Sequence, residues 1–112
     1  MAVRLTRAWR PLDEDEVARV PGQLGVYEIA DEAGRVLYVG AAEGRSLFGL
    51  RGEVTAWLAR HGDGAARFRF EVTSTYTTRR RELLMVHVHD TGALPPLVPA
   101  DEAAGLGRLT PG

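Results

Sequence analysis

Two tyrosines are the side chains that the sequence places best for shared chemistry. Tyr27 ends a Gly-Val-Tyr triplet, and Tyr38 begins a Tyr-Val-Gly triplet a short distance further along the chain. Each triplet lies in a short apolar, β-prone run, and the polar segment 31–35 between them contains a glycine that can adopt a positive φ. This pattern predicts a β-hairpin carrying both phenols. In such a hairpin, two tyrosines ordinarily form a cross-strand packing pair.

Arginine and glutamate supply the other reactive groups. All fourteen basic residues are arginine, and the chain contains no lysine, asparagine or cysteine, which excludes amine, asparagine-amide and thiolate chemistry. An arginine guanidinium can bind a phosphate group through two hydrogen bonds. Glu82 and His89 share one face of a predicted helix, which would suit a metal or an active site. A polar residue at the edge of the core is the preferred interpretation of His89.

A helix is predicted over residues 47–60, and its orientation determines which of its charged side chains can reach the tyrosines. Ser46 is expected to cap this helix, and its apolar stripe consists of Leu47, Leu50, Val54, Trp57 and Leu58. Arg51 and Glu53 lie on opposite shoulders of the stripe, about 160° apart. Only one of them can face the tyrosines once the stripe packs on the sheet. We expect that residue to be Arg51, close to the glycine-rich end of the hairpin.

Residues 67–73 alternate strictly between apolar and charged side chains, which predicts a third strand. Arg67 and Arg69 should point away from the apolar face and extend a basic surface beside the tyrosines. A second helix is predicted over residues 78–88 and should be buried nearly all round. Three arginines at 79–81 in its first turn oppose the helix dipole, and either an anionic partner or solvent would relieve them.

Together these elements predict a single domain of the α+β class, with a small three-stranded, mainly antiparallel sheet flanked by helices. The N-terminal extension 1–24 should add an edge strand near Val3–Thr6 and a short helix from Asp13 to Val20. The main unit covers residues 25–98, and residues 99–112 form a loosely held tail.

Composition narrows the class of protein. The chain has 112 residues, of which 45% are hydrophobic and 26% charged, as expected for a globular domain. Its net charge of −1 argues against a strongly basic nucleic-acid binder. Neither a signal-peptide core nor a membrane-spanning run is present, so we expect a cytoplasmic protein without a membrane partner.

The order of hairpin, helix, strand and helix, with the two triplets on the hairpin, resembles the GIY-YIG nuclease family. The resemblance covers about residues 21–97. It includes a proline before the first triplet, a Leu-Arg-Gly segment around Arg51, and Glu82 at the start of the apolar part of the last helix. It implies a GIY-YIG-like fold and metal-dependent hydrolysis of phosphodiester bonds in nucleic acid, with DNA preferred over RNA.

The resemblance also implies roles for individual residues. Tyr27 and Tyr38 would act in catalysis, and Glu82 would hold one Mg²⁺ or Mn²⁺ ion. A single carboxylate suits Mg²⁺, which keeps most of its water ligands. Arg51 is the expected stabiliser of phosphorane charge, although the alignment also allows Glu53 at that position.

Further contacts with nucleic acid are expected from the arginines Arg45, Arg67 and Arg69. Arg45 is also a third candidate for the catalytic arginine. The asparagine that occurs late in the family has no counterpart, because the chain contains none.

Three functions follow from these observations. A metal-dependent endonuclease is preferred, and a non-catalytic nucleic-acid-binding module on the same fold is the alternative. The third is a structural or protein-interaction domain in which the tyrosines only pack. The near-neutral charge and the missing asparagine weigh against catalysis. A domain this small would need a fused or separate partner for targeting.

Overall fold

The computed structural model of the protein describes residues 4–60 and 64–102. It confirms the α+β class. The elements follow the chain in the order β1 (Arg10–Pro11), α1 (Glu14–Ala18), β2 (Gly25–Ala30), β3 (Val36–Ala42), α2 (Gly49–Ala59), β4 (Arg67–Val72) and α3 (Tyr76–Thr91).

The predicted hairpin forms the centre and one edge of the sheet. The strand order is β1-β4-β2-β3, and every neighbouring pair is antiparallel. Tyr27 lies opposite Gly40, and Ile29 lies opposite Tyr38. Gly34 in the connecting turn has a φ of 87°, as the sequence pattern predicts. Because cross-strand partners share a face, both tyrosines lie on the same side of the sheet.

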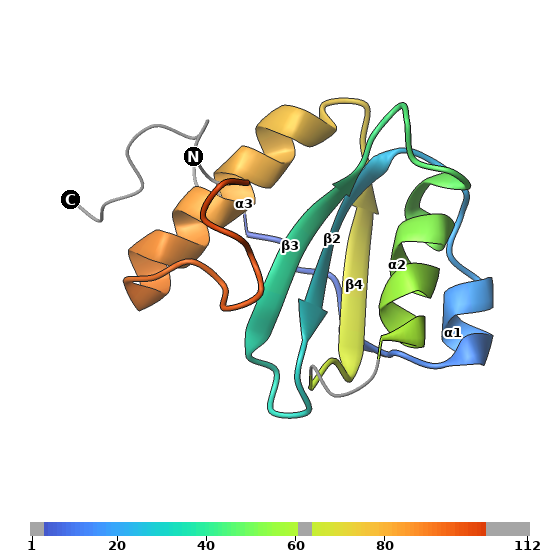
Figure 1. Ribbon diagram of the computed structural model, residues 1–112, viewed down its shortest axis with the longest axis horizontal. Helices are drawn as coiled ribbons and strands as arrows, with labels where there is room; N and C mark the ends of the chain where they lie inside the picture. The colour runs from blue at the N-terminus through green and yellow to red at the C-terminus, as the bar shows by residue number, and fades with distance from the viewer. Residues whose placement is uncertain (1–3, 61–63, 103–112) are drawn as a thin grey trace.

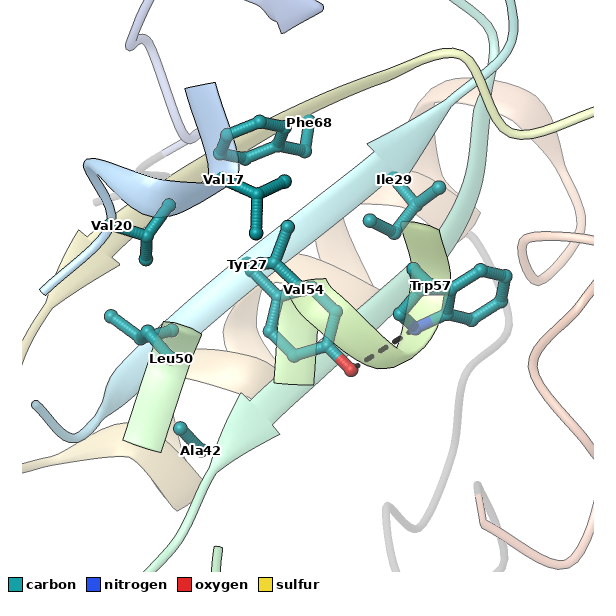
Figure 2. Packing of buried hydrophobic residues seen from close by; sticks show 9 residues of the cluster. All are labelled: Val17, Val20, Tyr27, Ile29, Ala42, Leu50, Val54, Trp57 and Phe68. Atoms are coloured by element: carbon teal, nitrogen blue, oxygen red, sulfur yellow. Dashed lines mark hydrogen bonds between the residues drawn. The ribbon is translucent and has the colours of Figure 1, made fainter. Parts of the chain in front are cut away.

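Helices cover both faces of the sheet, with α1 and α2 on one side and α3 on the other (Figure 1). On the α2 side, Tyr27 and Phe68 pack with Val54 and Trp57 in one buried cluster (Figure 2). On the α3 side, a second cluster brings the alternate strand residues together with Leu5 of the N-terminal segment. Its buried members are Leu5, Val26, Val39, Leu83, Leu84 and Val98.

Each triplet contains its glycine for a steric reason. A Cβ atom at Gly40 would lie 2.4 Å from the ring of Tyr27, so this glycine lets the ring lie across β3. A Cβ atom at Gly25 would lie 2.2 Å from the carbonyl oxygen of Glu71 on β4. Both positions therefore require glycine because another group already occupies the space where a side chain would begin.

The sheet has four strands, not the predicted three, because Arg10–Pro11 pairs with β4. The expected edge strand at Val3–Thr6 is wrong for residues 4–6, which form no strand, while residue 3 lies outside the described residues. The N-terminal segment instead contacts α3, where Arg4 forms a salt bridge of 2.7 Å with Asp90.

Both long helices also differ from prediction. Helix α2 begins at Gly49, since Phe48 at its N-cap position has a left-handed backbone, and Leu47 is exposed outside the predicted stripe. Helix α3 is longer than predicted at both ends, and Met85 on it is 45% exposed, so its expected burial on all sides is wrong. None of the helices in the described part of the chain combines the length and apolar character that crossing a bilayer requires.

Candidate functional site

The two tyrosines form an aromatic group with Trp57 of α2. The ring centroids of Tyr27 and Tyr38 are 6.1 Å apart, and those of Tyr38 and Trp57 are 5.0 Å apart. Trp57 Nε1 donates a hydrogen bond of 3.3 Å to the hydroxyl of Tyr27 (Figure 2). Tyr27 is buried, whereas Tyr38 lies on the edge strand β3 and is partly exposed. Only Tyr38 can therefore present its hydroxyl to a ligand.

The residue of α2 that faces the tyrosines is Glu53, so the expectation that Arg51 does so is wrong. The hydroxyl of Tyr27 donates to Glu53 Oε1 over 3.1 Å, and Ser46 Oγ donates to Glu53 Oε2 over 2.9 Å. Arg51 points to the other shoulder, where its Nε donates to the carbonyl oxygen of Val20 over 2.7 Å. A carboxylate therefore occupies the place where the family resemblance requires a cation.

Helix α3 presents Arg80 to the tyrosines at the open edge of the sheet. Arg80 Nε donates to the carbonyl oxygen of Val39 over 2.9 Å, which satisfies a backbone group of the edge strand. Its other end reaches the carboxylate of Glu102, with 2.7 Å between Nη2 and Oε1. The hydroxyl of Tyr38 donates to the same oxygen over 2.9 Å. Tyr38 and Arg80 thus converge on one anionic oxygen, which the C-terminal segment supplies.

Glu82, the predicted metal ligand, does not join this group. Its Oε1 accepts a hydrogen bond of 2.6 Å from Arg79 Nη1, and Arg79 also binds Glu71 of β4 with 2.9 Å between Nε and Oε2. Glu71 lies opposite Val26, on the sheet face that α3 covers. Tyr38 lies on the α2 face, so Glu82 and Tyr38, which the resemblance assigns to one active site, lie on opposite faces of the sheet and that assignment is wrong.

The predicted basic surface on β4 is also absent from this site. Arg69 faces α3, where its Nε donates to the buried Glu28 over 2.7 Å and its guanidinium lies 4.0 Å from the centre of the Trp9 ring. Arg67 is exposed and lies on the same sheet face as Arg69. His89 is exposed near the end of α3, apart from the tyrosines. Neither arginine therefore extends the tyrosine site.

A cleft of about 530 Å³ opens beside Tyr38 and Arg80. Its polar lining residues are Tyr38, Glu43, Arg45, Ser46, Glu53, Arg80 and Glu102. Arg45 is the one predicted nucleic-acid contact that the structure places here. The described residues thus bring two guanidiniums, one accessible phenol and three carboxylates to the same cleft.

Both tyrosines are held in their neutral form. Burial, followed by the charge of Glu53, raises the pKa of Tyr27 far above that of an ordinary phenol. Burial, followed by the hydrogen bond to Glu102, raises the pKa of Tyr38 to about 12. Near neutral pH both hydroxyls are therefore hydrogen-bond donors and cannot remove a proton from water.

The residues at the cleft do not fit the metal site that the family resemblance implies. The expected ligand, Glu82, binds Arg79 on the opposite face of the sheet. Within residues 4–60 and 64–102, no group of three or more His, Asp or Glu side chains is arranged to hold a metal ion. Of the three carboxylates that line the cleft, Glu53 and Glu102 are already bound to a phenol or an arginine.

Sequence reasoning missed two residues of the site, Arg80 and Glu102. The sequence shows Arg80 only as one of three consecutive arginines, and it does not say whether an anionic group or solvent surrounds them. Glu102 lies in the segment 99–112, which is expected to be a loose tail, but its backbone N donates to the carbonyl oxygen of Pro99 over 3.1 Å and its carboxylate binds Tyr38 and Arg80. No periodic signal marks such a segment, so the sequence offered nothing to find it by.

Comparisons with known proteins place the chain in a family without assigning it an activity. No curated protein matches the chain, and no solved structure matches it. The family model described as "Domain of unknown function (DUF7508)" matches residues 3–90, which is most of the chain. The chain belongs to this family.

Proposed function

We propose that this domain is a non-catalytic nucleic-acid-binding module with a GIY-YIG-like fold, which holds a backbone phosphate between Tyr38 and Arg80. The observation that carries the proposal is their convergence on one oxygen of Glu102, at 2.9 and 2.7 Å. A phosphate oxygen offers the same charge and accepts the same two hydrogen bonds.

Arg45 supports the proposal because its exposed guanidinium lines the same cleft and can meet a neighbouring phosphate. The net charge of −1 means that the whole surface would not attract nucleic acid, so affinity must come from this local cluster. Glu102 must leave the subsite when a phosphate enters. Its side chain is 37% exposed, which makes exchange feasible without unfolding the core.

The charges at the cleft argue against catalysis. Compared with the family pattern, Glu53 stands where a cation is needed and Arg80 stands where α3 should offer a carboxylate. A site built this way lacks the α2 cation and the α3 carboxylate, to which the resemblance gives the roles of stabilising phosphorane charge and holding the metal. It retains a donor phenol and a guanidinium, which are sufficient to bind phosphate.

The test is binding of a fluorescently labelled single-stranded oligonucleotide, followed by anisotropy. Arg80→Ala removes a charge-assisted contact of about 1.5–3 kcal/mol, so affinity should fall by about tenfold to 150-fold. Arg81→Ala is the matched control, because Arg81 is the next residue on α3, is exposed and lies outside the cleft lining. Tyr38→Phe should weaken binding while it preserves the ring.

Equal affinities of Arg80→Ala and Arg81→Ala would refute the subsite, because only net charge would then matter. Cleavage should be absent when the wild-type protein is incubated with DNA or RNA and Mg²⁺ or Mn²⁺. Cleavage that is lost in Glu53→Ala would replace the binding module with the endonuclease that the resemblance implies.

A further inference from the structure

Leu47 and Phe48 form the most exposed apolar pair among the described residues. Leu47 is 75% exposed and Phe48 is 68% exposed. They lie in the loop that joins β3 to α2 (Figure 1). Leu47 also lines the cleft that contains Arg45 and Arg80. An apolar surface thus adjoins the cationic groups of the proposed phosphate subsite.

The backbone holds this pair outward in a strained conformation. Phe48 has a φ of 65°, a left-handed conformation that is rare for a bulky side chain. It is the one non-glycine residue with a positive φ in the described part of the chain. Such strain persists where the surrounding structure enforces it, and it concentrates at functional sites.

Nearby glycines make this conformation sterically feasible. A Cβ atom at Gly52 would lie 2.0 Å from the carbonyl oxygen of Leu47, and one at Gly49 would lie 2.6 Å from the carbonyl oxygen of Gln23. Leu50 N donates to the same Gln23 oxygen over 2.8 Å, which ties the start of α2 to the loop before β2. The backbone that carries Leu47 and Phe48 is therefore closely packed against the start of α2 and the loop before β2.

We propose that Leu47 and Phe48 form a stacking platform for an unpaired nucleobase whose phosphate lies in the Tyr38–Arg80 subsite. This inference rests on the proposed function and specifies its ligand as single-stranded or locally unpaired nucleic acid. Nucleotides alternate an anionic phosphate with a flat apolar base, and the cleft brings the guanidiniums of Arg45 and Arg80 together with the apolar side chain of Leu47, next in sequence to Phe48. A base inside a continuous duplex keeps both faces in the duplex stack, so such a base cannot make this contact.

The test compares a labelled oligothymidylate with an abasic oligomer of the same length and charge. Phe48→Ala should weaken oligothymidylate binding by about fivefold to 150-fold, the range measured for loss of one stacked base. The same variant should leave affinity for the abasic oligomer and for a covalently closed circular duplex unchanged. Met85→Ala is the control, because Met85 is another exposed apolar side chain but lies on α3.

Phe48→Gly separates binding from folding. Glycine adopts the left-handed conformation without strain, so this variant should have a higher Tm than wild type and the same affinity loss as Phe48→Ala. Phe48→Trp should retain binding, since it keeps an aromatic face.

Three results with a wild type that binds would overturn the inference. The first is an equal loss of oligothymidylate and abasic binding in Phe48→Ala, and the second is no loss for either ligand. The third is a wild-type dimer in sedimentation velocity that Phe48→Ala converts to monomer, which would assign the pair to self-association. If Arg80→Ala loses binding and Phe48→Ala does not, the phosphate subsite stands and the platform fails. If wild type binds neither oligomer, both proposals fail.

Discussion

Glu102 should act as an internal competitor of phosphate, so its removal should strengthen nucleic-acid binding. Its carboxylate oxygen accepts hydrogen bonds from Tyr38 at 2.9 Å and from Arg80 at 2.7 Å. A phosphate that uses these two donors must first displace the carboxylate. In Glu102→Ala the donors are free in the unbound protein, and this part of the cost disappears.

The size of the effect follows from the exposure of the contact. An ion pair with a partly exposed carboxylate contributes about 0.2–1 kcal/mol, and the phenol hydrogen bond adds about 0.5–1.5 kcal/mol. Arg80 is 18% exposed and Glu102 is 37% exposed, which favours the middle of these ranges. A total of about 1–2 kcal/mol predicts an affinity increase of about fivefold to thirtyfold.

The assay is anisotropy titration of a labelled single-stranded oligonucleotide at fixed ionic strength. Asp101→Ala is the matched control, since it removes the same charge from the adjacent, exposed position. General repulsion of nucleic acid would make both variants bind equally more tightly. If Glu102→Ala binds no more tightly than Asp101→Ala, the carboxylate does not occupy the phosphate subsite and the reasoning is refuted.

Two further predictions concern the tyrosines. Gly40→Ala should lower the free energy of unfolding by about 1–3 kcal/mol, because the new methyl group displaces the buried Tyr27 ring. Gly44→Ala is the control and should change this free energy little, since no atom lies within 4 Å of the added methyl group. Urea unfolding followed by tryptophan fluorescence measures both variants, and equal values would contradict the steric argument. The pKa of Tyr38 is raised to about 12 in the folded state, so above about pH 10 the unfolded chain loses this proton first and stability falls through pH 12. Tyr38→Phe should make that alkaline decline shallower, and an unchanged slope would show that Tyr38 does not contribute.

Local patterns predicted the hairpin and the third strand correctly. The apolar runs around Tyr27 and Tyr38 form β2 and β3, and Arg67 and Arg69 face away from Phe68 as strict alternation requires. Asp13 caps α1 through its side chain, which accepts from Glu16 N. These features depend on neighbours in sequence, so a period of two or a cap residue is enough to recognise them.

The membership of the cleft could not be predicted in the same way. A helical wheel places Arg51 and Glu53 on opposite shoulders of α2, but the rotation of the helix on the sheet chooses between them. The start of the helix also differs from prediction, because Phe48, with its left-handed backbone, takes the N-cap position that Ser46 is expected to fill. Ser46 is consequently available to bind Glu53 instead.

The sequence by itself thus determined the α+β class, the hairpin and the shared face of Tyr27 and Tyr38, because strand pairing and alternation are local and periodic. Tertiary structure alone decided that Glu53, Arg80 and Glu102 surround Tyr38. These three residues come from two helices and a C-terminal segment that meet at the edge of β3. Their proximity depends on how each segment docks, and docking is set by shape complementarity across the whole core.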